Sequence, residues 1–202
     1  MRIRHLIPFA ALVLSACITP VTAPARLPTG SWELDPSHTS VAWRVRHTGI
    51  SWYVGRFDTM DASLDFDPAS PETARLVATV DAASISTGDT EFDLDLANGW
   101  LNAGSSPQIR FESTQIEVIS QASGRATGTL FLNGREIDTV MEIDFHGGVL
   151  NPFEQRRALG FSGRMQIDRT AFGIGNLPQS IVGADVFIEI EAEFLRTGAL
   201  DD

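Results

Sequence analysis

The chain has 202 residues, of which 26 are Asp or Glu and 15 are basic, all of them arginine, so its formal net charge at pH 7 is −11. An acidic surface repels nucleic acid and anionic headgroups, which argues against nucleic-acid binding and against membrane attachment through a basic patch. The length suits one domain with a sizeable core.

The N-terminus has the features of an export signal. Arg2 and Arg4 give a basic start, and the apolar run over residues 6–16 is 11 residues long, too short to stay in a bilayer as a spanning helix. The run ends Leu-Ser-Ala-Cys, which resembles a bacterial lipobox. We therefore expect a lipoprotein signal over residues 1–16 and lipid attachment at Cys17, with an ordinary secretory signal as the alternative. Because residue 18 is Ile and not Asp, the resemblance implies anchoring to the outer membrane, on the periplasmic side of the cell envelope.

The segments at the two ends of the mature chain are expected to lie outside the fold. Residues 17–30 contain three prolines and little apolar pattern, which predicts a flexible tether. Residues 197–202 are expected to form a frayed tail. No second linker, low-complexity tract or repeat lies between them, so residues 31–196 should form one domain. Cys17 is the only cysteine, so an acylated chain has no disulfide.

The first strand signal follows Asp35-Pro36, a dipeptide typical of turns. Apolar or aromatic side chains then alternate with polar ones, and this period of two predicts a half-buried strand. One face of the strand carries Val41, Trp43, Val45 and His47. Thr48-Gly49 ends it, and a second extended run reaches Gly55-Arg56-Phe57.

Most of the remaining chain repeats this alternation between turn residues. The alternating runs lie at residues 62–66, 76–82, 109–112, 126–132, 141–146, 159–167 and 185–194. Asn133-Gly134 is the strongest short hairpin signal. About eight such strands with short turns predict an all-β protein, a meandering antiparallel sheet closed as a barrel. The charge-rich face is too costly to face lipid, so the apolar face should point inward.

Residues 90–101 differ from this pattern. Acidic residues come first, then Leu96 and Ala97, then a glycine at residue 99. This order favours a short helix with a favourable N-terminal charge, lying near one end of the barrel.

Several landmarks occur in the order found in the YceI-like family of secreted lipid-binding proteins, which this chain resembles from about Trp32 to Phe194. They are Asp-Pro-Ser-His at 35–38, Val-Arg-His at 45–47, Gly-Arg-Phe at 55–57, the strand and turn at 64–68, the segment 80–88, Pro-x-Ile-x-Phe-x-Ser at 107–113 and Asp-Arg-x-x-Phe-Gly at 168–173. The chain departs from the family at residues 130–137, where the usual Thr-Ile-His-Gly-Val-Thr-Arg-Pro turn is replaced, and around residues 100–102.

The resemblance implies an extended, eight-stranded, lipocalin-like barrel that holds a long polyisoprenoid, such as a quinone tail or a prenyl phosphate. Burial is worth about 0.8 kcal/mol per CH₂, so each five-carbon unit would gain roughly 3–4 kcal/mol. The candidate cavity residues are Val41, Trp43, Val45, His47, Phe57, Leu64, Phe66, Phe111, Leu130, Phe161 and Met165. Each also fits an ordinary core position, and His47 fits a structural histidine.

The sequence contains no catalytic constellation and predicts neither a cofactor nor a metal site. The four histidines lack metal-ligand spacing. Acidic residues over 89–95 alternate like the start of a calcium loop, but Leu94 and Leu101 occupy the positions that need Gly and Glu. No serine lies in a Gly-x-Ser-x-Gly elbow.

We therefore expect non-enzymatic binding, storage or transport of a long apolar lipid in the cell envelope. The first alternative is a structural or interaction lipoprotein whose barrel is filled by side chains. An isomerase or hydrolase on the same barrel ranks last, because paired catalytic groups are missing. A homodimer is left open by the sequence.

Overall fold

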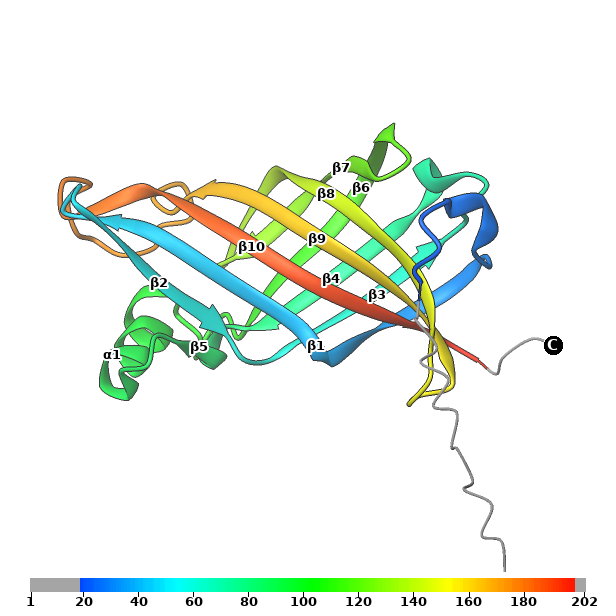
Figure 1. The fold of residues 1–202 in the computed structure, drawn as a ribbon. Helices are drawn as coiled ribbons and strands as arrows, with labels where there is room; N and C mark the ends of the chain where they lie inside the picture. The colour runs from blue at the N-terminus through cyan, green and yellow to red at the C-terminus, as the bar shows by residue number, and fades with distance from the viewer. Residues whose placement is uncertain (1–18, 199–202) are drawn as a thin grey trace, which may run out of the picture.

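The structure, a computed structural model, describes residues 19–198 and shows a closed antiparallel β-barrel (Figure 1). Within these residues the strands are β1 (Gly30–His47), β2 (Ser51–Phe57), β3 (Met60–Phe66), β4 (Arg75–Asp81), β5 (Ile85–Ser86), β6 (Gln108–Ser120), β7 (Ser123–Leu132), β8 (Arg135–Asn151), β9 (Arg156–Asp168) and β10 (Val182–Arg196). Pairing of β10 with β1 closes the sheet.

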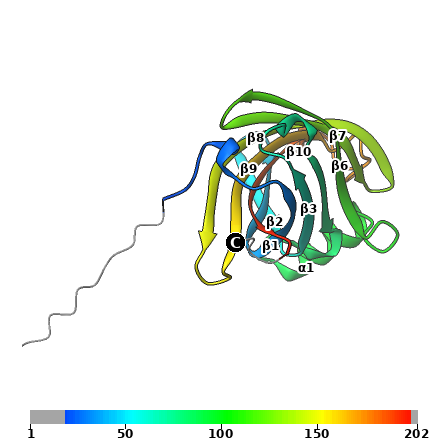
Figure 2. The ribbon, with the colours of Figure 1, turned by 90° about the vertical axis from the view of Figure 1, so that its right-hand side faces the viewer.

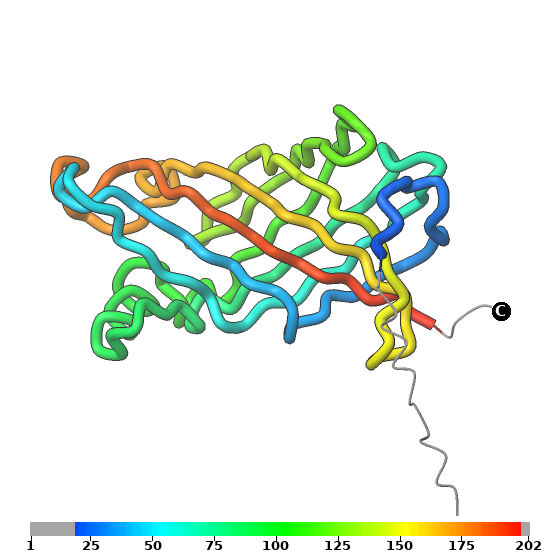
Figure 3. Tube along the Cα trace, viewed as in Figure 1, coloured from blue at the N-terminus to red at the C-terminus, as the bar shows by residue number. Residues whose placement is uncertain are grey.

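Within the described part of the chain, the ten strands form a barrel wall that is eight strands wide. β2 and β3 follow one another and pair with different halves of β1, so they act as one bent strand, while β5 is only a two-residue addition beside β2. The predicted all-β, eight-stranded antiparallel barrel with a short helix is confirmed. The long, tilted strands give it an elongated form (Figure 3).

β1 is bent by an insertion at the predicted turn. Asp35 pairs with Glu193 and Ser40 with Glu191, so residues 36–39 lie opposite a single residue of β10. Asp35-Pro36 therefore does not precede the strand, as its turn chemistry suggests, but lies at a bulge within it. Such an insertion increases local twist and helps the strand follow a closed barrel.

One end of the barrel carries the helical segment and two loops (Figure 1). α1 (Thr90–Asp95) is capped by Asp89, whose carboxylate accepts hydrogen bonds from the N–H groups of Glu91 and Phe92, and continues into a π-helical turn, η4 (Leu96–Trp100). Leu96 and Ala97 are buried in an apolar cluster inside this end of the barrel. The loops over residues 48–50 and 169–181 lie at the same end.

The opposite end carries both ends of the described chain (Figure 2). It includes η1 (Pro24–Arg26), η2 (Pro71–Thr73) and the β8–β9 hairpin, whereas η3 (Ala82–Ser84) belongs to the helical end. A second apolar cluster here contains Leu27, Trp32 and Leu159.

Part of the segment 17–30, which the sequence predicts to be a flexible tether, contacts the barrel in the structure, over residues 21–27. Val21 pairs with Gly148 through two backbone hydrogen bonds of 2.8 and 2.9 Å, and Leu27 is buried. A Cβ at Gly147 would lie 2.9 Å from the carbonyl oxygen of Val21, so these glycines allow a close approach that a local reading of the prolines does not reveal. Residues 1–18, including the signal and Cys17, and residues 199–202 lie outside the described part of the chain.

Residues 19–198 supply every strand of the closed wall and both apolar clusters, so the chain from Thr19 onward contains the whole folding unit described here. None of the helices in this range is long and apolar enough to cross a membrane.

Candidate functional site

The barrel encloses an apolar cavity of about 840 Å³. Its lining extends from Pro24 and Pro71 at one end to Leu177 and Ile181 at the other, so the cavity follows the barrel axis. This volume lies within the range of small-molecule sites. It also argues against the alternative of a barrel filled by its own side chains.

The cavity exists because small residues occupy inward positions in the middle of the wall. Ala62 of β3 and Ala78 of β4 lie opposite each other, and both line the cavity. On the other side, Gly163 of β9 lies between Ile143 and Ile190 and lines the cavity, and a Cβ there would lie 3.0 Å from Sδ of Met141.

The structure brings all the residues predicted for the cavity into its lining. These are Val41, Trp43, Val45, His47, Phe57, Leu64, Phe66, Phe111, Leu130, Phe161 and Met165. Several of them, including Leu64, Phe111 and Leu130, are also buried core residues. These positions are therefore both part of the core and part of the cavity lining. Their contact with a lipid stays a prediction.

Sequence reasoning missed the lining contributed by the loops and the helical segment. These residues include Phe92, Leu96, Trp100, Ile174, Leu177 and Ile181. They carry no period-two pattern, so only the folding of these segments over the end of the barrel reveals them. Tyr53 was also missed, although its spacing of four residues from Phe57 places it on the same face of β2.

An aromatic row lines the helical end of the cavity. The ring centroids of Trp43 and Tyr53 are 6.1 Å apart, and those of Tyr53 and Phe92 are 5.7 Å apart with perpendicular planes. Gly55 makes room for Trp43, because a Cβ there would lie 2.7 Å from Cε2 of the indole and 3.0 Å from the carbonyl oxygen of Ser86. These three rings therefore form part of the cavity lining at this end.

Arg169 holds the β9–β10 loop in place at the same end. Its side chain is only 2% exposed and donates hydrogen bonds to five backbone carbonyls. The acceptors are Gly183, Ile174, Gly175, Leu177 and Val182. A buried guanidinium with satisfied donors acts here as a structural cross-link, and it fixes the loop that carries Leu177 at the cavity rim.

Next to this arginine, Asp168 stabilises the start of the loop. Its Oδ1 accepts hydrogen bonds from the hydroxyl and the N–H of Thr170, at 2.6 and 2.8 Å, and these bonds lower the pKa of Asp168. The family-like turn at residues 168–173 is thus explained by local hydrogen bonding.

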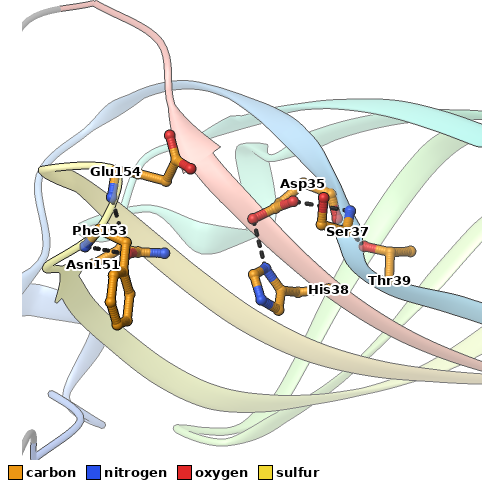
Figure 4. Close-up of polar contacts among 7 residues, drawn as sticks. All are labelled: Asp35, Ser37, His38, Thr39, Asn151, Phe153 and Glu154. Carbon is orange, nitrogen blue, oxygen red and sulfur yellow. Dashed lines mark hydrogen bonds and ion pairs between the residues drawn. The ribbon is translucent and has the colours of Figure 1, made fainter.

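A polar cluster lies at the β1 bulge on the outer face of the barrel (Figure 4). Asp35 accepts hydrogen bonds from Nδ1 of His38 at 2.8 Å and from the N–H of Ser37 at 3.0 Å. One atom each of Asp35, His38 and Glu193 that could bind a metal ion lies within 4.8 Å of the other two. A cation at this point would first have to displace the proton that His38 shares with Asp35, so the cluster as it stands is a hydrogen-bonded turn.

We predict that this cluster stabilises the fold most at mildly acidic pH. Burial alone would raise the pKa of Asp35, but the hydrogen bonds from His38 and Ser37 hold it below its usual value. The hydrogen bond to Asp35 and the attraction of Asp35, Glu193 and Glu154 raise the pKa of His38. The contribution of Asp35 is lost as pH falls through its lowered pKa, and that of His38 as pH rises through its raised one. Both are complete between about pH 4 and 6.5.

His38→Ala should therefore lower the urea midpoint most near pH 5.5, and the difference from the unmodified protein should narrow above about pH 8. Asp35→Asn should lower the pKa of His38 measured by NMR titration. A midpoint difference that is the same at both pH values would contradict the prediction.

A serine, a histidine and a glutamate also meet on the outer face, but in an order unsuited to catalysis. Ser162 donates its hydroxyl proton to Oε2 of Glu191 at 2.7 Å, and its oxygen lies 2.6 Å from Nε2 of His146. His146 must then donate to the serine. In a catalytic triad the histidine accepts the serine proton and the acid binds the histidine. This group therefore offers no activated nucleophile.

The fold and the cavity together define a class: closed antiparallel barrels that enclose an apolar cavity along their axis. The model of the YceI-like domain family matches residues 32–194. The chain thus belongs to the YceI-like family, and the resemblance drawn from its sequence landmarks is confirmed.

Relatives and solved structures agree with this assignment. A UPF0312 protein of Pseudomonas paraeruginosa is 33% identical over 138 residues, which cover 68% of this chain and 71% of that protein. The crystal structure of BcnA from Burkholderia cenocepacia matches with a TM-score of 0.72 and 24% identity, over 79% of this chain and 98% of that one. A polyisoprenoid binding domain from Saccharophagus degradans matches with a TM-score of 0.56 and 11% identity, over 84% and 99% of the two chains, so that likeness concerns the fold.

Proposed function

We propose that this protein binds a long apolar lipid, most simply a polyisoprenoid of the quinone or prenyl phosphate type, and stores or carries it in the cell envelope without transforming it. The observation that carries the proposal is the apolar cavity of about 840 Å³ that follows the barrel axis. Membership of the YceI-like family supports it, as does the fold shared with a domain described as polyisoprenoid binding.

The energetics of the cavity suit a slender hydrocarbon chain. Each five-carbon unit transferred from water to an apolar lining gains roughly 3–4 kcal/mol, so a few units outweigh the entropic cost of association. Inward-facing aliphatic and aromatic side chains provide apolar contacts all along the barrel axis. Few polar groups line the cavity, so the lining should distinguish little between one hydrocarbon tail and another.

The polar group of such a lipid is best placed at the helical end. His47 lines the cavity there, whereas Glu117 lines it at the opposite end. A phosphate or a quinone carbonyl accepts hydrogen bonds, so donors favour it and a carboxylate does not. In this proposal the tail extends from His47 toward Phe66 and Phe161.

Binding without catalysis is proposed because the cavity lining gathers no group of nucleophile, base and oxyanion donors. The location in the envelope is proposed from the signal and Cys17, which lie in the sequence before the described residues. Both parts of the proposal are independent of the lipid's identity.

Native mass spectrometry of the exported protein tests the proposal. We expect a stoichiometric added mass, and organic extraction should yield an isoprenoid fragmentation ladder. A protein that arrives empty and takes up no added prenyl lipid would refute the carrier and favour a scaffold for protein partners.

A further inference from the structure

Exposed apolar side chains gather at the helical end of the barrel, on the two loops that flank the cavity. Ile50, at 86% exposure, lies in the β1–β2 turn, and Leu177 and Ile181 lie in the β9–β10 loop. The N–H of Thr48 donates to the carbonyl oxygen of Ile181 at 2.7 Å, which joins the two loops. We call Ile50, Leu177 and Ile181 the apolar tip.

The apolar tip is continuous with the cavity. Leu177 and Ile181 line the cavity and are also partly exposed on the outside. Since the same two side chains belong to both surfaces, an apolar molecule can leave the cavity past them without crossing a polar belt.

Cationic and aromatic side chains flank the tip on the outer face of β1, β2 and β10. The Arg46 guanidinium lies 4.0 Å from the ring centroid of Trp52, and that of Arg44 lies 5.1 Å from it. Trp52 packs edge-on against Phe187 at 5.4 Å. Arg44 also pairs with Glu189 at 3.4 Å, whereas Arg46 makes no ion pair within residues 19–198.

We infer that this end of the barrel docks on a lipid bilayer that contains anionic lipid, a step that rests on the proposed function. The apolar tip enters the interfacial layer, Trp52 lies at headgroup depth, and Arg46 meets lipid phosphates. Exposed aliphatic side chains beside tryptophan and arginine are the combination that binds bilayer interfaces. An acidic protein that concentrates free cationic charge beside its cavity opening is complementary to such a surface.

The acidic helical segment sets the orientation of docking. α1 and its cap carry Asp89, Glu91, Asp93 and Asp95, and they lie at the same end of the barrel as the β1–β2 turn but apart from it (Figure 1). Because an anionic surface repels these carboxylates, the barrel should contact the bilayer through its β1–β2 side. This places the cavity opening at the lipid and keeps α1 away from it.

The test measures sedimentation of the chain from Thr19 to Asp202 with vesicles of phosphatidylcholine alone and of phosphatidylcholine with phosphatidylglycerol. Ile50→Asp should reduce the partition into mixed vesicles about tenfold or more, because it removes an inserted aliphatic side chain and adds a charge. Arg46→Glu should reduce it about tenfold in mixed vesicles and little in phosphatidylcholine alone. The matched control is Phe153→Asp, an equally exposed apolar residue in the β8–β9 hairpin at the opposite end, which should bind as the unmodified protein does.

Equal partition of Ile50→Asp and the unmodified protein would overturn the inference, as would a loss caused by Phe153→Asp. Self-association abolished by Ile50→Asp, without vesicle binding, would identify the tip as a contact between copies and would also overturn it. Farnesol uptake in vesicle-free solution, followed by tryptophan quenching, separates this outcome from failure of the proposed function. A chain that takes up farnesol but binds no vesicles refutes docking alone, and one that shows tip-dependent vesicle binding but no uptake refutes the carrier alone.

Discussion

Replacing Arg169 with methionine should destabilise the protein by about 3–5 kcal/mol, because hydrogen bonds from a charged donor are worth about 1.5–3 kcal/mol each and buried carbonyls would lose their partner. Five backbone carbonyls accept hydrogen bonds from this side chain. Because Arg169 is only 2% exposed, water can replace only part of these bonds. Urea denaturation measures the effect as a lower midpoint. The loop that carries Leu177 should also become more accessible to protease.

The matched control for this substitution is Arg164→Met in β9, the strand that precedes Arg169. Arg164 is exposed and pairs with Asp144 at 2.6 Å, so solvent screens the pair and its loss should lower the urea midpoint far less than the loss of Arg169. Arg169→Lys should be intermediate, since an ammonium reaches fewer of the carbonyls. If Arg169→Met is no more destabilising than Arg164→Met, the loop is held by other contacts and the cross-link assigned to Arg169 does not exist.

Replacing Ala78 with tryptophan should block the middle of the cavity and weaken polyisoprenoid binding by on the order of 10²–10³-fold. Ala78 lines the cavity beside Ala62, its partner on the neighbouring strand β3, so both side chains at this point of the wall are small. An indole there displaces about one five-carbon unit of the ligand, a loss of roughly 3–4 kcal/mol. Titration with a defined prenyl alcohol, followed by intrinsic fluorescence or calorimetry, measures the dissociation constant.

Val77→Trp is the control for this experiment. Val77 is the neighbouring residue of β4, faces outward and pairs with Glu112. Its replacement should leave the dissociation constant within about twofold, because the new ring lies outside the barrel. A ligand that binds both variants as tightly as the unmodified protein does not occupy the cavity. The proposed function would then require a different site.

The strands were predictable because their information is local. Alternation over residues 40–47 assigns Val41, Trp43 and Val45 to one face, and the pleat of a strand leaves no other choice. The same rule placed Phe111 and Met165 inside. In the cavity lining, local pattern and tertiary position agree wherever a residue belongs to a strand.

Loops and long-range contacts were not predictable in this way. Nothing local marks Leu177 or Ile181 as rim residues, because their position depends on hydrogen bonds from Arg169 to the loop. Val21 lies in a proline-rich segment, and its pairing with Gly148 depends on a strand more than a hundred residues later. Net charge averages over the surface and does not reveal that Arg44 and Arg46 lie together beside Trp52.

The sequence by itself determined the strand pattern, the direction of the apolar face, the short helix and the YceI-like family, because each rests on side-chain periodicity or on ordered short motifs. Only the tertiary structure decided that the barrel holds a cavity and where that cavity opens. Both depend on whether small residues from strands far apart in sequence, such as Ala78 and Gly163, face a common space. Volume is a property of the closed wall as a whole, and no single strand carries it.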